Sequence, residues 1–148
     1  MTHQLNFIYN DSDWVCPAEY PDLSKATEIA IDLETKDPNI KTKGPGWATF
    51  DGHIVGFAVA ALGQQWYFPI AHDAGGNMDL SITCAWMQDV LKFPATKIFH
   101  NASYDVGWLL VNGFEIRGKI VDTMIAAAII NENRFSFSLN ACAKDYLG

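Results

Sequence analysis

The sequence has little positive charge. Its 148 residues include 10 Lys and Arg against 17 Asp and Glu, which gives a net charge of −7 and a pI near 4.8. A protein that binds nucleic acid through a broad basic surface has the opposite balance. If this chain binds nucleic acid, something other than its own net charge must offset the phosphates.

Cysteine and long apolar runs are also scarce. The three cysteines are odd in number, far apart and form no C-x-x-C pair: Cys16, Cys84 and Cys142. This pattern argues against a zinc cage or a disulfide framework, and it predicts a reduced, cytosolic setting. The polar N-terminus lacks the apolar core of a signal peptide, and no apolar run is long enough to span a bilayer.

What remains is the composition of one folded domain. Hydrophobic residues make up 49% of the chain and charged residues 18%, which argues against disorder. Turn-forming residues dominate positions 9–25, so we expect an irregular lead-in over 1–24 and one domain over 25–148.

Apolar periodicity predicts strands first and then an alternation of strands and helices. Expected strands cover 28–33, 53–62, 65–70, 97–100 and 116–121, with a hairpin at Gly63-Gln64. Expected helices cover 81–93, 104–111, 123–130 and 138–147, with Ser81, Asn101 or Ser103, and Asp122 as cap candidates for the first three. This order predicts an α/β fold, a mixed sheet of about five strands flanked by helices.

The stretch IAIDLETKDP ends an apolar strand with two carboxylates. Residues two apart share a face of a strand, so Asp32 and Glu34 point the same way, opposite Ile31 and Leu33. Paired carboxylates repel each other unless a cation lies between them, and they suit Mg²⁺ or Mn²⁺. The alternative is that Asp32 caps a turn and Glu34 is a solvated charge.

A second acidic stretch, HNASYDVGWLL, also follows a short strand and opens a helix. Asp105 lies in the first turn of that helix, where the helix dipole favours a carboxylate and where an acidic residue is also ordinary. If the two strands are neighbours, Asp32, Glu34 and Asp105 converge on one pair of metal ions.

Together these motifs resemble the 3′→5′ exonuclease (proofreading) domain of phage-type family A DNA polymerases, in the DnaQ-like or DEDD superfamily with an RNase H-like fold. IAIDLET resembles the first exonuclease motif and KIFHNASYDVGWL the second. GPGW, WYFPIAHDAGGN, IVDTMIAAAIINENR and SFSLNACAKDYLG also resemble this subgroup.

The resemblance implies roles for six residues. Asp32, Glu34 and Asp105 would ligate two divalent metal ions, Mg²⁺ or Mn²⁺, that catalyse hydrolysis of the 3′-terminal phosphodiester of DNA. Bound metal would also offset the phosphates on an acidic protein. Thr35 would contact the 3′ end, and Asn101 and Tyr104 would line the path of the strand. As alternatives, Thr35 is a turn residue and Tyr104 a half-buried aromatic.

Other residues near these motifs have simpler interpretations. Lys36, Lys41 and Lys43 form a local basic cluster. This cluster either contacts the DNA backbone or, more simply, belongs to a solvated loop. Asp122 is expected to cap a helix rather than serve as a fourth ligand. His72 is expected to be structural, and Trp47 and Trp108 to pack in the core or loops.

The family pattern continues with a third motif, Y-x-x-x-D or H-x-x-x-D, which this sequence does not contain after Asp105. We therefore expect a partial exonuclease domain that is inactive or weak by itself and that precedes a polymerase domain in its parent chain. The expected partner is a single-stranded or frayed DNA 3′ end, and the expected location is the cytoplasm, of a bacterial host if the gene is phage-encoded.

Three alternatives stay open at this point. A ribonuclease D-type 3′→5′ exoribonuclease shares the same motifs, and a catalytically dead domain of this fold would bind nucleic acid without cutting it. A generic α/β domain with coincidental motifs is the third.

Overall fold

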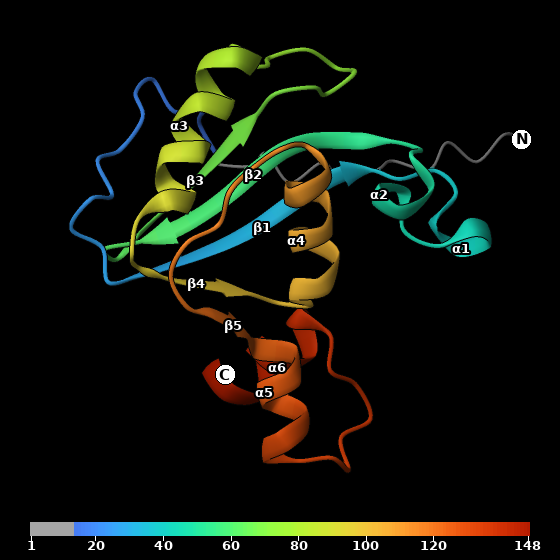
Figure 1. Cartoon of the computed structure of the whole chain (residues 1–148). Helices are drawn as coiled ribbons and strands as arrows, with labels where there is room; N and C mark the ends of the chain where they lie inside the picture. The colour runs from blue at the N-terminus through green and yellow to red at the C-terminus, as the bar shows by residue number, and fades with distance from the viewer. Residues whose placement is uncertain (1–13) are drawn as a thin grey trace, which may run out of the picture.

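A five-stranded mixed sheet organises the chain, in the order β3-β2-β1-β4-β5. The computed structural model describes residues 14–148, so most of the expected lead-in over 1–24 lies outside the described residues. The strands are β1 (Glu28–Lys36), β2 (His53–Ala61), β3 (Gln64–Pro69), β4 (Thr96–Phe99) and β5 (Ile120–Asp122). The helices are α1 (Ile40–Lys43), α2 (Gly46–Thr49), α3 (Leu80–Lys92), α4 (Ala102–Val111), α5 (Thr123–Ile130) and α6 (Leu139–Leu147). The predicted fold class is confirmed (Figure 1).

The side chains of the central strand β1 point alternately to a buried face and to an open face of the sheet. Ile29, Ile31 and Leu33 are buried, whereas Ala30 and Asp32 are only half-buried and Glu34 is exposed. The buried side chains form one core with Met87 and Leu91 of α3 and Trp108 and Leu109 of α4. The alternation expected from IAIDLET is therefore what divides core from solvent.

The first three strands form an antiparallel meander. β1 pairs with β2 and β2 with β3, and the β2–β3 hairpin turns through Leu62 and Gly63. Both turn residues have positive φ, 54° and 73°, as a two-residue type I′ turn requires. The predicted hairpin is confirmed, with its turn one residue earlier than Gly63-Gln64.

The second half adds two parallel strands through helical crossovers. α3 connects β3 to β4, which pairs in parallel with β1, and α4 connects β4 to β5, which pairs in parallel with β4. Lys97 of β4 is fully buried, and its ammonium donates hydrogen bonds to the carbonyls of Phe93, Ala95 and Arg117. This buried cation ties the end of α3 to the segment before β5.

The predicted start of α3 and the predicted extent of the strand over 116–121 are wrong. α3 begins at Leu80 and is capped by Asp79, whose carboxylate accepts from the Ile82 N–H at 2.9 Å, so Ser81 lies inside the helix. The expected strand over 116–121 is reduced to β5, because Gly118 has φ +84° and lies against the carbonyls of Pro94 and Ala95. Within the described residues, no helix is long and apolar enough to cross a membrane.

Candidate active site

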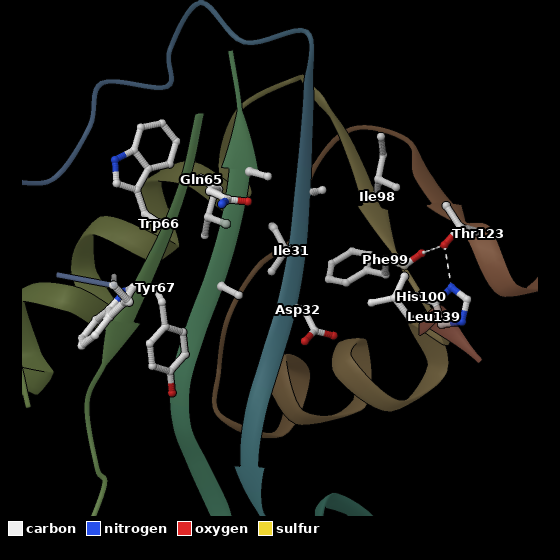
Figure 2. A pocket seen from close by; sticks show the side chains of 15 residues that line it. Ile31, Asp32, Gln65, Trp66, Tyr67, Ile98, Phe99, His100, Thr123 and Leu139 are labelled. Carbon is white, nitrogen blue, oxygen red and sulfur yellow. Dashed lines mark hydrogen bonds between the residues drawn. The ribbon is translucent and has the colours of Figure 1, made fainter. Parts of the chain in front are cut away.

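The open face of the sheet carries a hollow of about 490 Å³. Its floor is formed by small and apolar side chains of β1, β2 and β4, including Ala30, Ala58, Ala60 and Ile98. Asp32, Tyr67 and His100 are among its polar lining residues, and Figure 2 shows them around this hollow. The predicted first-motif aspartate therefore lies in a concave site rather than on a flat surface.

Asp32 and Glu34 both project from this open face, as expected from their spacing. Asp32 pairs with Ala58 of β2 and Glu34 with Gly56, and the register shifts between Glu34 and Thr35. Burial raises the pKa of Asp32, and the nearby His100 opposes that rise. The extra residue is Val55 of β2, which lies between the partners of Glu34 and Thr35, so the irregularity is in β2 opposite the two carboxylates.

Asp105 comes from α4, which packs against the buried face of the sheet. Its side chain is buried, with 3% exposure, and it interacts with the backbone of Leu33. Burial first, and then the charge of Asp32, raise the pKa of Asp105 to about 7, with smaller contributions from Asp122 and Glu34. The structure thus brings the three predicted carboxylates within electrostatic range of one another.

Asp122 positions the helix that carries Asp105. Its carboxylate accepts hydrogen bonds from the N–H groups of Asn101 and Ala102 at the start of α4, at 3.1 and 2.8 Å. It also accepts from Met124 and Ile125 at the start of α5, so one side chain caps two helices. Burial disfavours its ionisation, but these four N–H groups prevail and lower the pKa of Asp122.

Asn101 precedes α4 in the left-handed conformation, with φ 69° and ψ 55°. Its side chain makes no cap bond to α4; its carbonyl oxygen accepts from the Ser103 hydroxyl at 3.1 Å. Asparagine tolerates this backbone region better than most residues. The position of Asn101 therefore has a backbone explanation, one turn before Asp105.

Thr35 and Tyr104 are bonded to each other. The Tyr104 hydroxyl donates to Asp37 at 2.9 Å, so Thr35 is the donor in the 2.8 Å bond between the two hydroxyls. Asp37 also accepts from the Gly46 N–H of α2 at 2.8 Å. Thr35 and Tyr104, which are both predicted to contact the nucleic acid strand, thus lie side by side and are linked to α2 through Asp37. The neighbouring Lys36 forms an exposed ion pair with Asp73.

His100 closes the β4 side of the hollow. Its Nδ1 bonds to the Thr123 hydroxyl at 2.9 Å, and its Nε2 donates to the Phe137 carbonyl at 2.8 Å, which holds the segment before α6 against the sheet. No motif had singled out Tyr67 or His100 as site residues. The only signal for His100 was its place inside the second motif, KIFHNASYDVGWL, at the end of the expected strand.

The acidic residues have the right chemistry for a hard divalent cation but do not form a closed cage. Within residues 14–148, no three His, Cys, Asp or Glu side chains are grouped so that they could hold one ion. Asp32 lines the hollow and Glu34 projects from the same face of β1, whereas Asp105 reaches the site from α4. Carboxylate oxygens are nevertheless the donors that Mg²⁺ and Mn²⁺ prefer, and a cation would relieve the mutual repulsion that raises the pKa of Asp105.

Comparison with known sequences gives a family match over most of the chain. Residues 20–148 match the sequence model of the DNA polymerase A exonuclease family, described as a 3′-5′ exonuclease. A DNA-directed DNA polymerase of Pseudomonas phage M6 is 34% identical over 145 residues, or 93% of this chain. The chain spans only 22% of the length of that relative and 19% of a second phage DNA polymerase.

Solved structures of the same fold include two nucleases. Brucella melitensis NrnC with bound Mg²⁺ is 19% identical, with a TM-score of 0.60 over 85% of this chain and 56% of NrnC. Escherichia coli RNase D, an exoribonuclease involved in structured RNA processing, is 19% identical, with a TM-score of 0.57 over 84% of this chain and 28% of RNase D. At these identities, both comparisons establish the fold alone.

Proposed function

We propose, from the premise that this chain belongs to the 3′-5′ exonuclease domain family of family A DNA polymerases, that it binds a DNA 3′ end on its open sheet face and takes part in hydrolysis of the terminal phosphodiester. The observation that carries the proposal is the placement of Asp32, Glu34 and Asp105 within electrostatic range of one another at the edge of a concave site.

The carboxylates of Asp32, Glu34 and Asp105 hold divalent metal ions, two Mg²⁺ or Mn²⁺ in the working site. Such ions supply Lewis-acid stabilisation of the phosphate and the leaving oxygen. Burial first, and then the charge of Asp32, disfavour the ionised form of Asp105, which supports this assignment because a bound cation favours the ionised form of each acid. It also explains how a protein with net charge −7 accepts DNA.

Thr35, Tyr104 and Asn101 position the strand at the rim. The Thr35–Tyr104–Asp37 chain of hydrogen bonds fixes both hydroxyls before any ligand arrives, which lowers the entropic cost of binding. Asn101 presents its amide at the start of α4, close to Asp105 in sequence.

The working context of this domain is also part of the proposal. Residues 25–148 form the exonuclease unit, residues 1–24 lead into it, and a polymerase domain of the parent chain supplies frayed primer ends. The site of action is the cytoplasm of a bacterial host. The phage polymerase relatives support DNA rather than RNA as the substrate.

Asp32→Ala provides the test. We expect the wild-type chain to bind Mn²⁺ in calorimetry and to shorten a 5′-labelled oligodeoxynucleotide from its 3′ end only weakly, since it lacks the third motif, and Asp32→Ala to lose both. Loss of a group from such a constellation costs orders of magnitude in rate. Degradation that persists in Asp32→Ala would contradict the proposal, as would absence of both Mn²⁺ binding and degradation in the wild type. Faster cleavage of a ribose-tipped oligonucleotide would favour the ribonuclease D-type alternative.

A further inference from the structure

Tyr67 lies on the open face of the sheet in the same row as Asp32. Asp32 pairs with Ala58, and Ala58 pairs with Tyr67, so the three side chains share one face. Strands lie about 4.8 Å apart, which places Tyr67 roughly 10 Å from Asp32 across β2. Both residues line the hollow, and Figure 2 shows the Tyr67 ring on the β3 side of it.

Gly56 directs the Tyr67 hydroxyl toward Glu34. A Cβ atom built on Gly56 would lie 2.1 Å from the phenol oxygen, so the ring occupies the space that any other residue would fill. Gly56 pairs with Glu34, and facing Cβ positions across an antiparallel pair are about 4.5–5.5 Å apart. The hydroxyl therefore stands directly beside the Glu34 side chain. A glycine inside a strand is a common mark of such a close approach.

His72 holds the hydroxyl from the other side. The Tyr67 hydroxyl is hydrogen-bonded to His72 Nε2, and the two rings meet edge to face. Asn77 fixes the His72 backbone by accepting from its N–H at 2.7 Å and donating to its carbonyl at 2.8 Å. In the tautomer whose Nε2 donates to the phenol oxygen, the phenol proton is free for a ligand in the hollow.

An anionic ligand in the hollow would have to be bound by uncharged donors. Among its described lining residues there is no lysine or arginine. His100 and Thr123 already bond each other and backbone carbonyls. The phenol O–H group is uncharged, so it can donate to an anionic oxygen without forming an ion pair with the nearby carboxylates.

We propose that Tyr67, oriented by His72 and admitted by Gly56, donates a hydrogen bond to a non-bridging phosphate oxygen of the nucleic acid strand beside Glu34. This inference rests on the proposed function, because it requires that a phosphodiester enters the hollow. It assigns a substrate contact to β3, a strand that carries neither acidic motif.

Tyr67→Phe removes only the hydroxyl, and Tyr20→Phe is its matched control. Tyr20 is bonded to Thr83 of α3 at 2.7 Å, away from the hollow. The probe is a 5′-fluorescein-labelled oligo-dT, followed by anisotropy with Ca²⁺ in place of Mg²⁺ to slow hydrolysis. We expect Tyr67→Phe to weaken binding about tenfold or more, since a hydrogen bond to a charged group is lost, and Tyr20→Phe to bind as the wild type does.

Further measurements separate a substrate contact from a structural role. We expect Tyr67→Phe to keep wild-type Mn²⁺ binding and thermal midpoint, and Gly56→Ala, which displaces the ring, to weaken oligo-dT binding as well. The inference is overturned if Tyr67→Phe binds oligo-dT like the wild type. It is equally overturned if that variant loses Mn²⁺ binding and stability together with DNA binding, because the hydroxyl then serves the fold.

The two proposals fail in different ways. If Asp32→Ala abolishes Mn²⁺ binding while Tyr67→Phe changes nothing, only the role of Tyr67 is wrong. If the wild type binds neither Mn²⁺ nor oligo-dT, the exonuclease proposal is wrong, and the role of Tyr67 falls with it.

Discussion

Asp105 is an acid buried beside other acids, and at the scale of single residues it makes the metal-free protein sensitive to pH. The pKa of its carboxyl rises from 3.8 to about 7 on folding, so the folded state binds the proton more tightly than the unfolded state does. The contribution of Asp105 to the free energy of unfolding therefore falls as pH rises from about 4 through 7. In EDTA, we expect thermal denaturation at pH 8 to show Asp105→Asn more stable than the wild type, by on the order of 1–3 kcal/mol.

At pH 4 the two proteins should be nearly equal, because Asp105 is then mostly protonated in the folded state. The comparison is made with Asp105→Asn rather than with the wild type alone because Asp122 has the opposite dependence. Its pKa is lowered in the folded state, so its stabilising effect is present above its unfolded pKa and lost in acid. A stability difference between Asp105→Asn and the wild type that does not change with pH would contradict the assignment to Asp105.

Among the elements, α4 depends on a glycine that its own helix propensity disfavours. A Cβ atom on Gly107 would lie 2.4 Å from Cε2 of the Trp47 ring in α2. Alanine is the better helix former by about 0.8–1.0 kcal/mol, but overpacking costs about 1–3 kcal/mol. We expect the clash to prevail, so that Gly107→Ala lowers the free energy of unfolding in urea by roughly 1 kcal/mol or more.

Leu110→Ala on the exposed side of α4 is the control for this substitution. Leu110 is 58% exposed, so its truncation should change stability by no more than about 0.5 kcal/mol. A Gly107→Ala protein that is more stable than the wild type would show that α2 moves away without cost.

Local signals in the sequence predicted most helices and strands. They failed where contacts between segments far apart in the sequence determine the structure. The alternation in IAIDLET fixed which side chains of β1 face the core, and Asp122 was correctly expected to cap α5. Its second set of bonds, to the start of α4, depends on the pairing of β4 with β5 and has no local signal. Gly118 shortens β5 for the same reason, since its contacts with Pro94 and Ala95 are tertiary.

The candidate site shows the same division. The two acidic motifs could be read from the sequence because carboxylates at the ends of strands have a recognisable spacing. The place of Tyr67 could not, because it depends on a register that puts Gly56 between Glu34 and the phenol. The roles of Asp32, Glu34, Thr35, Asn101, Tyr104 and Asp105 remain predictions until the variants are measured.

For the molecule as a whole, the C-terminal helices leave a large apolar surface in solvent. The large hydrophobic side chains on α5 and α6 that are more than half exposed are Ile125, Ile129, Ile130, Leu139, Tyr146 and Leu147. Exposed apolar side chains in such number favour association. We expect light scattering to show a mass that grows with concentration, and Ile129→Lys to shift the chain toward the monomer.

Leu110→Lys is the matched change on α4, outside these helices, and should leave the association unchanged. A strictly monomeric wild type at high concentration would contradict this prediction. So would equal effects of the two lysine variants, because the association would then reflect net charge rather than the surface of α5 and α6.

The position of β1 at the centre of the sheet also sets an order of folding. β1, β2 and β3 pair as neighbours in sequence, whereas β4 must return to β1 across α3, bringing Ile98 to Ala30. Pairing across a long loop is slower than closing a hairpin, so we expect the meander to form first and the parallel strands to dock later. In that order Asp32, Glu34 and Tyr67 belong to the early half and Asp105 to the late one. We therefore expect the acidic cluster to be completed near the end of folding, so that a chain still emerging from the ribosome holds two of its carboxylates without the third.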